Sequence, residues 1–405
     1  MGALRLSGAG MQISHFKHYV LELSHRHGPL VIVQILVALG NTMANSFALI
    51  YLLREGLGYL ECAVFILICA LVPLLLTAFS SRTIVKNFPA SINTAFVALA
   101  GYYILLILLE GWYLVVIPPM LFGTYIATFW VPYNTLVMHI TSRKKRGAIV
   151  GMYFLIFPLL TTVTPLLGGV IIHLYSYDLL FALSAAVVLA DLFYVSGLGV
   201  LAKLRERIII PELLQSLKVN LVGKLQMDLD LRGVGLRLKW ALFAEGIQDG
   251  IFWVAIPLIS FEYAKTEISL SGYLTLFAFW GAVMTVALGY LSDRIKDRAH
   301  ITRIGAALGG AGAILAAGAA NAEGYVSAMS MSYFFIAIVH SFLFTMLLDK
   351  MERLKKKGVL VREFLLNSGR TLGMLTTISF LLLGWNLSAA LAIGGVAMAS
   401  VVVVR

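Results

Sequence analysis

Long apolar runs separated by short polar segments dominate the chain. Twelve of these runs hold about 20 residues each, the length that an α-helix needs to cross the roughly 30 Å hydrocarbon core of a bilayer. The spans are expected near 29–53, 58–80, 90–110, 113–139, 148–173, 177–202, 238–261, 269–291, 301–321, 325–348, 363–384 and 386–404. The pattern predicts an all-α integral membrane protein with twelve transmembrane helices.

Positive charges gather on one side of this predicted topology. If the amino terminus is cytoplasmic, 28 of the 31 lysine and arginine residues fall in segments assigned to the cytoplasm. Arg54 and Lys265 fall outside, and Arg370 falls within a span. Such a distribution follows the positive-inside rule. We therefore expect both termini in the cytoplasm, and we attribute the net charge of +11 to topology and not to nucleic-acid binding.

Composition supports the same class. Hydrophobic residues make up 60% of the chain and charged residues 13%, a balance that a soluble domain cannot bury. Residues 1–27 show no apolar core followed by a cleavage site, so we expect no cleaved signal peptide. The protein is expected in the cell membrane, as a multi-pass integral membrane protein.

One long polar connection divides the spans six and six. We expect a cytoplasmic tail over 1–27, a six-helix bundle over 28–202, a cytoplasmic linker over 203–237 and a second six-helix bundle over 238–405. The linker has apolar residues at helical spacing with basic residues between them, which predicts a helix at the membrane surface.

The two halves resemble each other. Residues 40–53 align with 246–259 without a gap, and Lys144-Lys-Arg-Gly147 corresponds to Lys355-Lys-Lys-Gly358. Two repeats in parallel orientation predict two bundles that face one another across a central cavity, an architecture typical of secondary transporters.

The turn Gly289-x-x-x-Asp293-Arg294-x-x-x-Arg298 resembles the signature loop of the major facilitator superfamily. The resemblance implies the fold of that family, transport by alternating access, and a gating role for this turn. The equivalent turn in the first half has Ser81 where the family usually has aspartate. We therefore expect gating to depend mainly on the second-half turn.

A second resemblance lies in the span 148–173. Pro165-Leu-Leu-Gly168-Gly169 is similar to the end of the Gly-Pro-x-x-Gly-Gly motif that is associated with exporters of this family. Thr164 stands at the place of the first glycine. The resemblance implies a helix-packing motif.

The signature turn also suggests a charge cluster. Asp293 is expected to reach the amino-terminal end of the span 363–384, where unpaired amides and the helix dipole favour an anion. Arg294 and Arg298 are expected to pair with Asp297 or Glu363. The alternative is that these charges only anchor the topology.

Ionisable residues within spans are the main candidates for a site. Asp249 lies eleven residues into the span 238–261, near the bilayer midplane, with Glu245 and Gln248 beside it. Asn367 and Arg370 lie in the span 363–384. Because charges at this depth are costly, they normally face a cavity or a partner. We expect Arg370 to hold one carboxylate while the other exchanges a proton with the cavity; a static structural ion pair is the alternative.

Polar residues of the first half extend the predicted cavity. Asn41 and Asn45 share one face of the span 29–53 with Gln34, and Tyr133 and Asn134 lie in the span 113–139. Amides here can bind solute, but they also bond helix to helix in membranes. Weaker candidates are Thr161, Thr162, Thr164 and His340.

No P-loop lysine, metal-ligand or nucleophile motif occurs in the sequence. We expect no enzyme activity, no cofactor and no metal site. The favoured function is secondary active transport by a monomer in the lipid bilayer, with proton-coupled export of a small amphipathic or cationic solute. Proton-coupled uptake of a sugar or organic acid, with Arg370 holding a carboxylate, is the alternative. A membrane-embedded enzyme or a lipid scramblase is more remote.

Overall fold

A computed structural model describes residues 31–140, 156–197, 234–291, 297–350 and 355–404. Every regular element in these ranges is helical. The labelled helices are α2 (Ala48–Arg54), α3 (Tyr59–Lys86), α4 (Phe88–Leu108), α5 (Gly111–Ile140), α7 (Thr164–Leu174), α8 (Tyr177–Gly197), α11 (Leu236–Ala264), α12 (Glu267–Leu291), α13 (Arg298–Ala317), α14 (Ala322–Lys350), α15 (Lys355–Leu382), α16 (Leu387–Ala399) and the 3₁₀ helix η3 (Ser400–Val403).

Ten helical segments among the described residues are long and apolar enough to cross a membrane. They agree with the first ten predicted spans and confirm the all-helical membrane class. The predicted spans 363–384 and 386–404 correspond to α15, the most polar of the described long helices, and to the shorter apolar helix Leu387–Val403. The count of twelve spans and the orientation of the termini stay predictions. Most of the predicted linker helix and the basic run at 143–146 lie outside the described residues.

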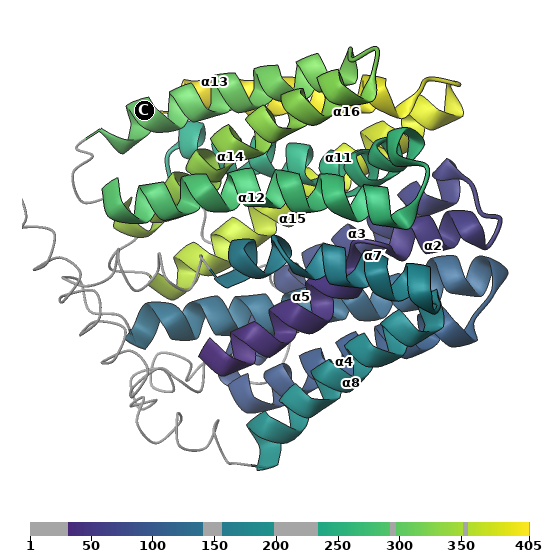
Figure 1. The fold of residues 1–405 in the computed structure, drawn as a ribbon. Helices are drawn as coiled ribbons and strands as arrows, with labels where there is room; N and C mark the ends of the chain where they lie inside the picture. The colour runs from purple at the N-terminus through teal and green to yellow at the C-terminus, as the bar shows by residue number, and fades with distance from the viewer. Residues whose placement is uncertain (1–30, 141–155, 198–233, 292–296, 351–354, 405) are drawn as a thin grey trace, which may run out of the picture.

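The helices form two groups that follow the two halves of the sequence. Figure 1 shows the purple to teal helices of the first half together, with the green to yellow helices of the second half beside them. Within the groups, α4 packs against α5 and α8, α13 packs against α14 and α16, and α11 packs against α15. The halves meet where α3 contacts α15 and where α7 contacts α12.

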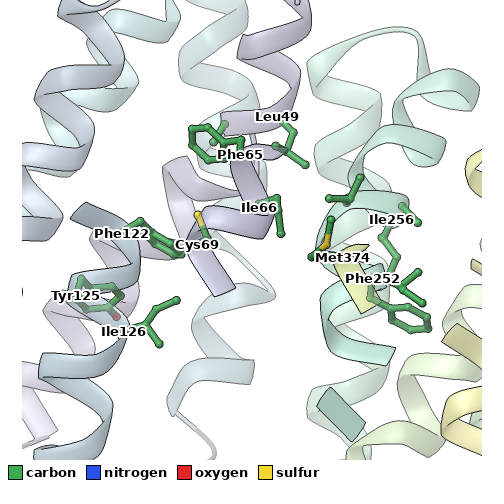
Figure 2. Close-up of a cluster of buried hydrophobic side chains, with 14 of the residues drawn as sticks. Leu49, Phe65, Ile66, Cys69, Phe122, Tyr125, Ile126, Phe252, Ile256 and Met374 are labelled. Atoms are coloured by element: carbon green, nitrogen blue, oxygen red, sulfur yellow. The ribbon is translucent and has the colours of Figure 1, made fainter. Parts of the chain in front are cut away.

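Apolar side chains fill the junction between these helices. Figure 2 shows part of one buried cluster to which both halves contribute, including Phe65 and Ile66 of α3 and Phe252 and Ile256 of α11. Cys69 is buried in the same cluster as a free thiol.

Small residues of α7 allow close approach on two sides. A Cβ at Gly168 would collide with the backbone oxygen of Met43 in the first half. A Cβ at Gly169 would lie 2.6 Å from Oγ of Ser271 on α12 in the second half. Pro165 is buried in the first turn of α7. This is the geometry that a helix-packing motif requires.

Candidate substrate and proton site

A close helix pair of the second half is built on glycines. Gly246 and Gly250 of α11 face α15, and Gly369 and Gly373 of α15 face α11. A Cβ at Gly250 would lie 2.8 Å from Cα of Arg370, and a Cβ at Gly369 would lie 2.8 Å from the backbone nitrogen of Ile247. A spacing of four places each glycine pair on one face of its helix, as in other small-residue helix contacts in membranes. Sequence reasoning did not single out these glycines, although the two Gly-x-x-x-Gly spacings were its available signal.

This close approach brings Asp249 and Arg370 together. Nε and Nη2 of Arg370 donate to Oδ2 of Asp249 at 3.0 and 2.6 Å. Nη1 of Arg370 donates to Oδ1 of Asn367 at 3.0 Å, and the guanidinium lies 4.5 Å from the ring centre of Trp253. The side chains are mostly buried, with 17% of Asp249 and 13% of Arg370 exposed. The predicted pairing of Arg370 with an acid of the span 238–261 is therefore present, and the acid is Asp249.

Glu245 has a more distant charge partner than Asp249 has. Its side chain is 1% exposed, and Oε1 lies 3.6 Å from Nη2 of Arg362. Arg362 donates from Nη1 to Glu363 at 3.0 Å and stacks over Phe344 at 5.0 Å. Oε2 of Glu245 has no hydrogen-bond partner among the described residues. Of Glu245 and Asp249, Glu245 is the acid whose charge is less fully matched.

Two further polar side chains lie beside these acids. Within the described ranges, Oε1 of Gln248 and Nε2 of His340 are buried without a hydrogen-bond partner. His340 comes from α14 and lies within electrostatic range of both Glu245 and Asp249. The site therefore draws on three helices of the second half, α11, α14 and α15.

The structure does not bring Asn41 and Asn45 into this cluster. The Tyr103 hydroxyl donates to Oδ1 and to the backbone oxygen of Asn41, both at 3.2 Å. The Tyr102 hydroxyl donates to Oδ1 of Asn45 at 3.0 Å. Both asparagines thus bond to α4 of their own half, which is the helix-to-helix role weighed as the alternative. Their contact with solute stays a prediction.

Two other first-half candidates, Tyr133 and Thr164, also bond within their bundle. The buried Tyr133 hydroxyl donates to Oε1 of Gln34 at 2.7 Å, and Asn134 is half-buried on α5. The Thr164 hydroxyl lies 2.6 Å from that of Thr42. These bonds join the helix at 31–45 to α5 and α7.

The gating turn is described only in part. Asp293 and Arg294 lie outside the described residues, and Gly289 lies near the end of α12. The expected contact of Asp293 with the span 363–384 therefore stays a prediction.

The partners predicted for Arg298 were wrong. Nη1 of Arg298 donates to Oδ2 of Asp349 on α14 at 2.8 Å. Asp297 instead caps α13, because its carboxylate accepts the backbone N–H of His300 at 2.9 Å. Glu363 is held by Arg362. Arg298 begins α13, so its side chain reaches the neighbouring helix α14 and not α15.

Asp191 is a buried acid that lies apart from this site. It lies on α8 with no exposed surface, and neither carboxyl oxygen has a hydrogen-bond partner in the part of the chain that the structure describes. The Tyr125 hydroxyl of α5 lies within electrostatic range of Asp191. It is also buried without a hydrogen-bond partner among the described residues.

Comparison with known proteins supports the fold and no more. No protein-family model and no curated protein matches the sequence. Among solved structures, the human organic anion transporter MFSD10 (TETRAN) is similar, with a TM-score of 0.64 over 93% of this chain and 98% of that chain. The sequence identity is 12%. The chain therefore has a fold similar to that of this membrane transporter.

Proposed function

We propose that the protein is a secondary active transporter that moves a small organic solute by alternating access, with Asp249, Arg370 and Glu245 as the centre of its site. The observation that carries the proposal is the buried Asp249–Arg370 pair in a transporter-like fold. Ionisable groups inside a membrane are costly, and where they occur they usually line solute or proton pathways.

Glu245 is the residue proposed to carry the proton. Arg370 is bonded to Asp249, and Arg362 is bonded to Glu363, so each guanidinium already has a close carboxylate. Glu245 is the third carboxyl near these two cations, and one of its oxygens has no partner within the described residues. An excess carboxylate in a buried site is relieved by binding a proton or another cation.

The same charge balance favours export of a cationic or amphipathic compound. A proton and a cationic solute would compete for the carboxyl of Glu245, and competition for one group couples their opposite movements. The Trp253 ring beside Arg370 offers an apolar surface for the uncharged part of such a solute.

An organic anion is the second candidate solute. Arg370 presents two N–H groups to a single carboxylate oxygen, and a solute carboxylate can take the place of Asp249. The similar solved structure is that of an organic anion transporter. In this case the solute would be taken up, and protonation of Asp249 would release Arg370.

Solute-dependent proton movement in proteoliposomes with a trapped pH dye tests the proposal. We expect Glu245→Gln to abolish proton flux driven by cationic compounds, because a glutamine cannot exchange a proton. The matched control is Glu323→Gln, an exposed acid at the start of α14, which should behave as the wild type.

The outcome also separates the candidates. Proton flux that persists in Glu245→Gln would contradict the assignment of the proton carrier. Flux that follows organic anions, and not cations, would overturn export of a cation in favour of the second candidate.

A further inference from the structure

One end of the molecule joins the two halves through a carboxylate. Arg54 ends α2 in the first half, and Glu267 begins α12 in the second half. Nε and Nη2 of Arg54 donate to Oε1 of Glu267 at 3.0 and 2.8 Å. The Tyr177 hydroxyl, at the start of α8, donates to the same oxygen at 3.0 Å. Three donors of the first half thus converge on one oxygen of the second.

Neighbouring contacts cross the same junction. The Tyr59 hydroxyl of α3 donates to Oε1 of Glu262 on α11 at 2.6 Å. The Arg54 guanidinium lies 5.3 Å from the ring centre of Phe261. Close by, a Cβ at Gly169 would lie 3.0 Å from the backbone oxygen of Glu267, so α7 and α12 lie very close.

At the other end of the junction, the described residues include an apolar contact between the halves. There, Leu360 of α15 packs against a small apolar cluster that contains Ile84 and Val85 of α3. This end carries the turns that the charge pattern assigns to the cytoplasm. The end with Arg54 and Glu267 is the one assigned to the opposite side.

The Arg54–Glu267 pair is suited to break and form again. Arg54 lies in the last turn of its helix and Glu267 in the first turn of α12, where the helix dipoles favour a cation and an anion respectively. Half of the Arg54 side chain is exposed, against 16% of Glu267. When the pair separates, each charge still interacts favourably with the dipole of its own helix, and it becomes hydrated. The buried Asp249–Arg370 pair has no such compensation.

We propose that Arg54, Tyr177 and Glu267, together with Tyr59 and Glu262, form an outer latch that holds the two halves together on the side opposite the predicted cytoplasmic loops and breaks when that side opens. The proposal rests on the alternating access of the proposed function and on the predicted orientation. It assigns a role to Arg54, one of the few basic residues outside the predicted cytoplasmic segments.

Distance measurements between spin labels test the latch without any transport assay. Labels at Glu110→Cys and Ala320→Cys report the separation of the two halves at this end, because these exposed residues lie in turns of opposite halves. Cys62 and Cys69, both buried, are replaced by alanine in every sample. We expect Glu267→Gln to raise the ratio of long to short distances roughly fivefold, the effect of losing one partly exposed ion pair.

Three further variants and a control keep the test decisive. The charge exchange Arg54→Glu with Glu267→Arg should return the distance distribution toward that of the wild type. Arg54→Glu alone should shift the distribution to longer distances. If Glu267→Gln does not fold, Tyr177→Phe removes one donor and should cause a smaller opening. Glu323→Gln, an exposed acid at the same end, should change nothing.

The result that overturns the latch is an unchanged distance distribution in Glu267→Gln and Tyr177→Phe. An exchange variant that stays as open as Arg54→Glu would also overturn it, since the pairing would then not be what holds the halves. Failure of the proposed function is a separate outcome, because proton flux could be absent while the distances still respond.

Discussion

Replacing Arg370 with leucine is expected to abolish transport and to lower the stability of the protein by about 3 kcal/mol, at the lower end of the cost of breaking a buried ion pair. The change leaves Asp249 without its two N–H donors and leaves Oδ1 of Asn367 without its arginine donor. The lower end applies because both side chains retain slight exposure. Denaturation of the purified protein in mixed detergent measures the stability, and the proteoliposome assay measures transport.

The double variant Asp249→Leu with Arg370→Leu separates folding from function. It should recover most of the lost stability, because an apolar pair of similar volume often replaces a buried ion pair at little cost. Transport should stay absent. Arg237→Leu, an exposed arginine near the start of α11, is the matched control and should change neither property. Normal transport by Arg370→Leu would show that the site lies elsewhere.

Replacing Gly369 with valine is expected to cause a loss of similar size by a different route. A Cβ at this position would collide with the backbone oxygen of Phe243, so α11 and α15 must move apart. Overpacking of this kind costs roughly 1–3 kcal/mol, and more where backbone atoms are the obstacle. The separation would also lengthen the hydrogen bonds between Asp249 and Arg370, which measure 2.6 and 3.0 Å in the structure. We therefore expect transport to be lost along with about 3 kcal/mol of stability.

Gly272→Val is the matched control for this change. Gly272 lies within α12 and is exposed, and no neighbouring atom would lie within 4 Å of a Cβ added there. The same substitution should be tolerated at this position. If Gly369→Val retained wild-type stability and transport, close approach of α11 and α15 would not be what positions the ion pair.

Hydropathy alone was enough to assign the class of the protein and to predict the depth of its charges. The thickness of the bilayer sets the length of an apolar helix, so the span positions follow from local composition. This is why Asp249 and Arg370 could be placed inside the membrane before any contact was known. The small-residue spacing at Gly246 and Gly250 is also present in the sequence, although it was not singled out there, and it allows the charged helices to approach each other.

The choice of partners, in contrast, came from the packing of the helices. Helix rotation and approach depend on contacts between segments far apart in the chain, and hydropathy does not record them. In the structure, Arg370 pairs with Asp249 and not with Glu245. Asn41 accepts a hydrogen bond from Tyr103 of its own bundle. The structure also joins Arg54 to Glu267, 213 residues away. Arg54 is one of the few basic residues that depart from the positive-inside pattern, and hydropathy does not say which acid it contacts, so its partner appears only once the two halves are packed.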